Sequence, residues 1–147
     1  MGYVIAIVLL ASTAMGAWIS NKSNLFMEET LSHSEIDIIV NSVKIYAQAI
    51  ELFVKNNPNY QGEIRDSQLN LPSWFPQDNR IKKAMFSGRG YLYLAETPGL
   101  FSELHQILHG SLLLGRVEHR VIVHLTEGKT QIPLPPNIPD GYLVYVL

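Results

Sequence analysis

The pattern of apolar and polar residues divides the chain into a uniformly apolar beginning and a longer part in which the two kinds are interspersed. The apolar stretch covers residues 1–19 and holds no charged side chain. A helix of that length spans roughly 28 Å at about 1.5 Å per residue, close to the thickness of the hydrocarbon layer of a bilayer. The pattern therefore predicts a transmembrane anchor over residues 1–22 and a single domain over residues 23–147.

Three other signals also begin with an apolar stretch. A cleaved secretory signal usually starts with basic residues, which this chain lacks, but small residues at 12–16 fit a cleavage site, so release by cleavage stays open. A lipoprotein needs a cysteine, and the chain has none. A type IV prepilin carries a glutamate at the fifth position of its apolar helix, where this chain has Ile7, so we do not interpret it as a pilin.

Small residues in the apolar stretch would let a second membrane helix approach closely. We therefore predict partner-binding roles for Gly2, Ala6, Gly16 and Ala17. A domain that follows an N-terminal anchor more often lies outside the cytoplasm, and a single lysine after the anchor, Lys22, is a weak signal for the opposite orientation. We expect a single-pass protein of the bacterial inner membrane whose C-terminal domain lies in the periplasm.

Apolar residues recur every three or four positions over residues 36–54, with polar residues between them, which predicts an amphipathic helix. Ser32 and Glu35 have the spacing of a capping box at its start. Pro58 and two preceding asparagines predict its end near Lys55. We expect this helix to be the packing spine of the domain.

The second half of the chain shows strand patterns separated by turn residues. This order predicts an α+β fold, with helices packed on one face of an antiparallel sheet, which is pilin-like in outline by analogy. The expected elements are a hairpin of residues 81–86 and 91–95 around a turn at 87–90, a helix over 99–109 that Gly110 ends, one strand bent near Gly115 or two strands over 112–125, a short edge strand over 130–134, and a strand over 142–147.

The segment between the first helix and the hairpin is polar and interrupted by prolines, and Trp74 is its largest side chain. Tryptophan is enriched at binding hot spots, which makes Trp74 a candidate partner-binding residue. The alternative, which the sequence favours, is that it fills the core beneath a long loop.

Charge and cysteine content narrow the classes of function. The 147 residues carry a formal net charge of −2 with the charges scattered, which argues against nucleic acid as the main partner. The absence of cysteine removes disulfides, thiol catalysis and thiolate metal sites. Arg80, Lys82 and Lys83 form a small basic cluster, which we interpret as a solvated strand edge.

Candidate chemistry is sparse. His105 and His109 stand four residues apart, a spacing that places two imidazoles on one helix face as a metal site requires. Gln106 replaces the glutamate of the metalloprotease motif, and the position of a third ligand, His119 or Glu118, is not fixed by the sequence. No nucleophile elbow is present. We therefore expect no enzyme activity, no metal site and no cofactor, with His105 and His109 as the weak candidates.

The opening Met-Gly-Tyr-Val-Ile-Ala-Ile-Val-Leu-Leu, the Leu-Leu-Leu-Gly motif and the proline-rich C-terminal half resemble the PilM proteins of type IVb thin-pilus operons. These short, membrane-anchored proteins occur with plasmid conjugation pili and differ from the actin-like protein of the same name. The resemblance implies an inner-membrane component of the pilin transport apparatus or basal body. It identifies no functional residues.

The leading hypothesis is therefore a non-enzymatic component of a pilus assembly apparatus that contacts other pilus machinery proteins or pilins, with no nucleic acid involved. The first alternative is a periplasmic binding module released by signal cleavage. The second is a membrane-anchored metal-dependent hydrolase that uses His105 and His109.

Overall fold

The computed structural model describes residues 33–111, 113–124 and 127–147. The chain divides into a unit that ends at Asp37 and a compact unit from Ile38 to Leu147, and the sheet belongs to the second unit. The predicted anchor over residues 1–22, with its small partner-binding residues, lies outside the described part. Among the described helices, none combines the length and the hydropathy that crossing a bilayer requires.

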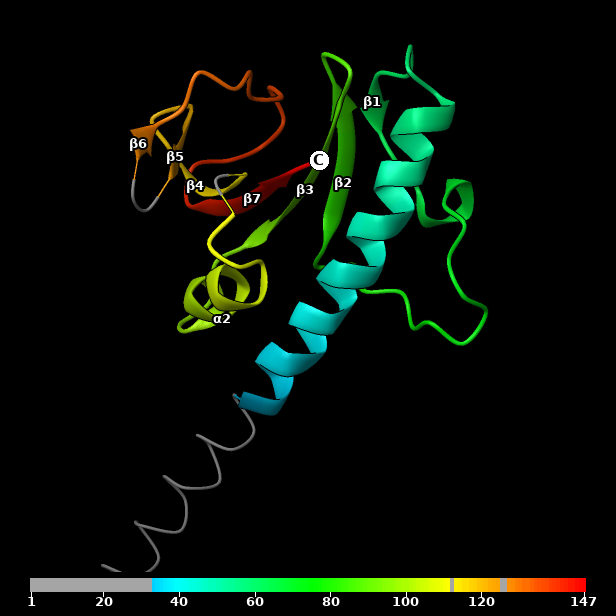
Figure 1. The fold of residues 1–147 in the computed structure, drawn as a ribbon, viewed down its shortest axis with the longest axis horizontal. Helices are drawn as coiled ribbons and strands as arrows, with labels where there is room; N and C mark the ends of the chain where they lie inside the picture. The colour runs from blue at the N-terminus through cyan, green and yellow to red at the C-terminus, as the bar shows by residue number, and fades with distance from the viewer. Residues whose placement is uncertain (1–32, 112, 125–126) are drawn as a thin grey trace, which may run out of the picture. The chain divides into compact units, whose positions relative to one another are not determined.

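The centre of the fold is a seven-stranded sheet in which every neighbouring pair is antiparallel (Figure 1). The C-terminal strand lies in the middle of the sheet, between strands from the two halves of the domain, so the chain end joins both halves. In the order β1-β2-β3-β7-β4-β5-β6 the strands are Gly62–Glu63, Lys82–Phe86, Arg89–Ala95, Tyr142–Val146, Leu114–Glu118, Val121–His124 and Gly128–Lys129.

The predicted spine is a helix over residues 33–56, and the predictions of its type and its end are confirmed. It ends where Asn57 closes the last turn, because both the backbone N–H and the side-chain amide of Asn57 donate to the carbonyl of Phe53, each at 2.9 Å. Ser32, the predicted cap, lies outside the described residues. The buried face of this long helix includes Ile39, Val40, Val43, Tyr46, Ala47 and Ile50.

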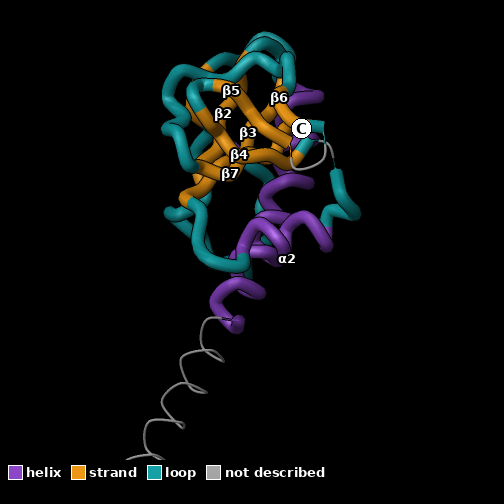
Figure 2. The backbone as a smooth tube through the Cα atoms, turned by 90° about the vertical axis from the view of Figure 1, so that its left-hand side faces the viewer, coloured by secondary structure: helices purple, strands orange, loops and turns teal. Residues whose placement is uncertain are grey.

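The helices cover one face of the sheet, as the sequence predicts. A Cβ atom built on Gly90 of β3 would lie 2.5 Å from Cγ2 of Ile50, so the long helix packs directly on this strand. The second helix, α2 (Leu100–Ile107), lies below the strands in Figure 2 and stacks Phe101 against the Arg116 guanidinium of β4 at 5.5 Å. The α+β class is therefore confirmed for the described residues.

The opposite face is covered by the segment of residues 130–141, which we call the proline segment. It lies over a core cluster from β2, β3, β4, β5 and β7, to which the segment adds Ile132, Leu134 and the fully buried Ile138. The bounds of the predicted edge strand over 130–134 are wrong. The strand that pairs with β5 is Gly128–Lys129, the N–H of Thr130 adds one bond to the carbonyl of Ile122 at 2.9 Å, and residues 131–134 form no strand. Instead the Tyr91 hydroxyl donates to the carbonyl of Pro133 at 2.6 Å, which holds the segment across the sheet.

The apolar stretch after α2 forms two strands, and the break lies at His119 and Arg120 rather than near Gly115. Both turn residues have positive φ, 50° and 64°, as a tight two-residue hairpin requires. Gly115 serves close packing instead, because a Cβ atom there would lie 2.6 Å from Cγ2 of Ile122.

The end of α2 differs in detail from the prediction. The helix ends at Ile107, and His109 and Gly110 follow with φ values of 53° and 69°. The N–H of Gly110 donates to the carbonyl of His105 at 2.8 Å, and that of His109 to Gln106 at 3.2 Å, the pattern of a Schellman motif. Gly110 belongs to the stop signal, as predicted, while His109 takes the first left-handed position.

Candidate functional site

A cleft of about 550 Å³ opens between the β1–β2 edge of the sheet and the proline segment. Its floor comes from strand alternation, because the side chains of Ala84 and Phe86 in β2 point to the same face as Tyr93 of β3 and Tyr142 of β7. The rings of Tyr93 and Tyr142 lie 6.3 Å apart with an interplanar angle of 47°. The floor is therefore aromatic and held by the central sheet.

The second wall of the cleft consists of Pro135, Pro136, Asn137 and Pro139. Proline fixes φ and loses little conformational entropy on folding, which favours an extended, preformed wall. This wall is fastened to the sheet because Ile138 is completely buried and the N–H of Gly141 donates to the carbonyl of Val117 at 2.8 Å.

Charge enters the cleft only at its rim, where exposed Glu63 and Lys82 stand on β1 and β2. Tyrosine is neutral at physiological pH, and burial raises the pKa of Tyr93 further, so its hydroxyl is a neutral hydrogen-bond donor. Aromatic rings, prolines and neutral donors suit the burial of an apolar or proline-containing segment of another molecule. The two rim charges add orientation to such an interface.

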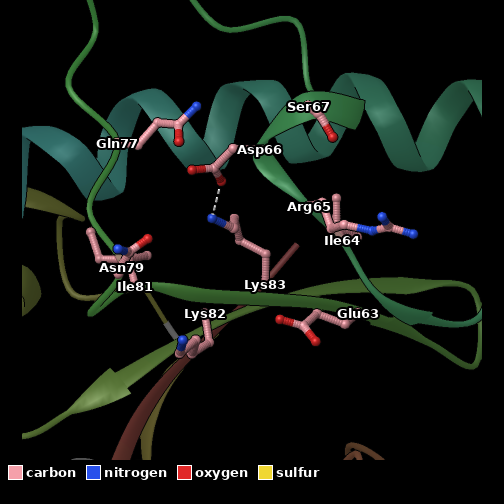
Figure 3. A pocket seen from close by; sticks show the side chains of 10 residues that line it. All are labelled: Glu63, Ile64, Arg65, Asp66, Ser67, Gln77, Asn79, Ile81, Lys82 and Lys83. Atoms are coloured by element: carbon pink, nitrogen blue, oxygen red, sulfur yellow. Dashed lines mark hydrogen bonds and ion pairs between the residues drawn. The ribbon is translucent and has the colours of Figure 1, made fainter.

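On the helix side of the same strands lies a polar hollow of about 330 Å³ (Figure 3). Lys83 of β2 points into it and donates to Asp66, the first residue of the short 3-10 helix η1 (Asp66–Gln68). The hydroxyl of Tyr46 donates to the other carboxylate oxygen of Asp66 at 3.0 Å, and the Lys83 ammonium lies 4.1 Å from the centre of the Tyr46 ring. The hollow is therefore backed by a paired buried network that joins the long helix, η1 and β2.

The surroundings of Tyr46 shift its pKa upward. Burial is the largest cause that raises the pKa of Tyr46 to about 12, while the N–H of Asp78, which donates to the hydroxyl at 3.2 Å, acts in the opposite direction. The Arg80 guanidinium donates to both carboxylate oxygens of Asp78 and holds the pKa of that carboxyl below its usual range. Tyr46 is thus a neutral donor at physiological pH, and the network holds the structure together.

This geometry corrects the interpretation of Arg80, Lys82 and Lys83 as a solvated basic edge. Lys83 is 6% exposed and ion-paired with Asp66, so it does not belong to a solvated edge. Arg80, which is paired with Asp78, and Lys82, at the cleft rim, are both exposed. The sequence interpretation failed for Lys83 because the segment that carries Asp66 folds over β2 from a distant part of the chain.

The two candidate metal ligands do not share a helix face. His105 lies in α2, but His109 lies beyond the helix end in a left-handed conformation, so the four-residue spacing does not align them. The ring of His105 instead lies 6.3 Å from that of His124. Within residues 33–111, 113–124 and 127–147, no three histidine, cysteine or carboxylate side chains are grouped to hold a metal ion.

Trp74 is 73% exposed, so the expectation that it fills the core is wrong. The adjacent Phe75 is buried and packs edge-on against Tyr46, with ring centres 5.0 Å apart, and so takes the core position. Trp74 contacts Phe75 edge-on and otherwise projects outward. Its exposure keeps it as a candidate contact residue, while the four small residues of the apolar stretch lie outside the described part.

The cleft is not among the predicted features, although the sequence contains signals of it. Four prolines in residues 133–139 indicated a rigid extended segment, and Tyr142 opens a strand pattern. The sequence does not indicate that this segment packs on the face of β2 and β3, because the contact joins residues about forty positions apart.

Comparison with known proteins gave matches in two forms. The family described as PilM matches residues 7–146. A solved structure provisionally named PilM from Escherichia coli B7A is similar with a TM-score of 0.64 and 24% identity, over 79% of this chain and 94% of that one. Another, from Pseudomonas aeruginosa 2192, has a TM-score of 0.48 and 30% identity, over 77% and 93%. A comparison with curated proteins gave no match.

Proposed function

Because this chain belongs to the PilM family, we propose that it is a non-enzymatic component of a type IVb pilus assembly apparatus that acts through protein contacts. The observation that carries the proposal is the family match, which spans residues 7–146 and thus nearly the whole chain. In this proposal residues 1–22 anchor the protein in the bacterial inner membrane, and the domain that follows lies in the periplasm. Its partners are other pilus machinery proteins or pilins.

The contact surface that we propose on the domain is the cleft beside the proline segment. Its aromatic floor offers apolar surface area, and burial of such area is the main favourable term in protein association. A wall of prolines is already ordered before a partner arrives, which lowers the entropic cost of binding.

The mode of contact that suits this edge is insertion into the cleft and not the addition of a strand. β1 is only two residues long, and the Tyr60 hydroxyl donates to the carbonyl of Glu63 at 2.7 Å. This bond occupies an acceptor that a new strand would need, and short, capped edges resist edge-to-edge pairing. A partner segment that inserts side chains between Tyr93 and the prolines meets no such obstacle.

The test is site-specific photo-crosslinking of the full-length protein in cells that assemble the pilus. A photoreactive amino acid replaces Asn137 on the cleft wall, and the matched control carries it at Gln48, an exposed position of the long helix. We expect the Asn137 probe to capture pilus machinery proteins or pilins, and the Gln48 probe to capture much less.

Equal capture at both positions, or capture of unrelated exported proteins only, would overturn the cleft as the contact surface. Fractionation of the same cells tests the proposed location. Recovery of the intact chain with the inner membrane supports the anchor, whereas a shorter soluble form in the periplasm would favour the released binding module.

A further inference from the structure

We propose that Arg120 is the positioning residue of the cleft, because it clamps the proline segment that forms one wall. Its guanidinium donates to the carbonyls of Ile138, Pro136 and Pro135, the last two at 3.1 and 3.3 Å. Two of these residues, Pro135 and Pro136, line the cleft directly. One side chain therefore gathers the carbonyls of the wall onto the end of the β4–β5 hairpin.

The backbone of Arg120 adds a fourth hydrogen bond to the same segment. Its N–H donates to Oδ1 of Asp140 at 3.0 Å, two residues beyond Ile138. Carbonyls on both sides of Asn137 and a carboxylate near the end of the segment are thus fixed by a single residue. The planar guanidinium suits this role, since it offers five donors in a fixed arrangement, whereas a lysine offers a single ammonium group.

The conformation of the turn supports the assignment. His119 and Arg120 both have positive φ, which is costly for residues that carry a Cβ atom, and turns of this kind usually contain asparagine and glycine. The turn of the β2–β3 hairpin in the same sheet, at Ser87 and Gly88, uses glycine in its second position. Contacts elsewhere must offset the strain at Arg120, and its four hydrogen bonds to the proline segment are the contacts that do so.

Arg120 and the other attachments hold different parts of the proline segment. The Tyr91 hydroxyl holds Pro133, which lies outside the cleft lining, and the buried Ile138 side chain anchors the segment in the core. The N–H of Ile138 also donates to the carbonyl of Pro135 at 3.3 Å, but this bond lies within the segment, and the N–H of Gly141 fastens the end of the segment to Val117. The bonds that tie the carbonyls of Pro135 and Pro136 to the β4–β5 hairpin come from Arg120, so the position of the wall at these two prolines depends on Arg120.

The test combines hydrogen exchange with three variants of the full-length protein. In Arg120→Ala we expect the Gly141 amide, which donates to the carbonyl of Val117, to exchange about tenfold faster or more. The reason is that losing hydrogen bonds from a charged group makes local opening of the segment more favourable by about that factor. Arg120→Lys keeps the charge and the aliphatic stem, and we expect it to restore little of the protection. Arg89→Ala, at an exposed position next to the turn of the β2–β3 hairpin, is the matched control and should leave the exchange of the Gly141 amide unchanged.

Exchange of the Tyr93 amide in the central strand β3 reports whether the sheet itself stays intact, and we expect no change there. Unchanged exchange at Gly141 in Arg120→Ala would overturn the clamp, and so would full restoration by lysine. Equal acceleration at Gly141 and Tyr93 would also overturn it, because Arg120 would then support the whole domain instead of one wall.

The consequence for binding rests on the function proposed above, and the same variants separate the two. With the probe at Asn137, Arg120→Ala should lower partner capture several-fold relative to Arg89→Ala. If the unmodified protein captures no partner at Asn137, the proposed contact surface fails, while the exchange experiment still decides the clamp. If capture occurs and is equal in both variants, the clamp does not govern binding.

Discussion

Tyr46→Phe removes one oxygen atom from the buried network between the long helix, η1 and β2. That oxygen donates to Asp66 at 3.0 Å and accepts from the Asp78 N–H at 3.2 Å, and Tyr46 itself is completely buried. A hydrogen bond to a charged group contributes about 1.5–3 kcal/mol, and a buried N–H left without an acceptor costs about 1–3 kcal/mol. Asp66 keeps its Lys83 partner, so we expect the lower part of the sum, about 2–4 kcal/mol.

The assay is urea unfolding followed by circular dichroism, with Tyr60→Phe as the matched control. Tyr60 loses the same atom, but its hydroxyl donates to the Glu63 carbonyl at an exposed site, so we expect a cost of about 1 kcal/mol or less. If the free energies of unfolding of the two variants agree within about 0.5 kcal/mol, the reasoning about burial is refuted.

The same variant predicts an alkaline effect. The pKa of Tyr46 is raised to about 12, so the folded state favours the neutral phenol. The stability that this contributes is fully present below about pH 10, where an unfolded tyrosine is neutral, and is lost as the pH rises toward 12. Burial also raises the pKa of Tyr91, Tyr93 and Tyr145, so part of the loss remains in Tyr46→Phe. The variant should lose less stability over this range than the unmodified protein, and an equal loss would contradict the assignment.

Three further outcomes are expected. Gly90→Ala should destabilise the domain by about 1–3 kcal/mol in the same urea assay, because the new methyl group meets Ile50, and a smaller effect would mean that the helix moves away easily. Trp74→Ala should change stability by less than about 0.5 kcal/mol, since the ring is mostly exposed; a large loss of stability would assign it to the core. Zinc titration by calorimetry should give no heat that depends on His105 and His109, and micromolar binding lost in the double alanine variant would restore the metal hypothesis.

The elements that the sequence predicted correctly are those whose signals lie within a few residues of one another. The long helix follows from apolar spacing over residues 36–54 and ends at the asparagines before Pro58. The β2–β3 hairpin follows from two strand patterns around Ser87 and Gly88, although β3 begins at Arg89, two residues closer to the turn than expected. Both elements depend on backbone preferences that a short stretch of chain already expresses.

The errors lie where contacts between distant segments overrode a local pattern. Residues 130–134 resemble an edge strand, but the Tyr91 hydroxyl and the core hold them across the face of the sheet. Trp74 and Phe75 are adjacent aromatic residues, and the one that faces Tyr46, Phe75, is buried in the core. A sequence pattern does not distinguish these cases, because it contains no information on what lies opposite.

By itself, the sequence determined the class of the fold, the long helix, the hairpin and the resemblance to PilM, since periodicity, turn residues and family likeness are properties of the chain in order. Only the tertiary structure decided that the C-terminal strand lies in the middle of the sheet, that Lys83 is buried against Asp66, and that the proline segment closes a cleft with Arg120 as its clamp. These features depend on pairing segments far apart in the chain, and such pairing is selected by the packing and hydrogen bonding of the whole domain.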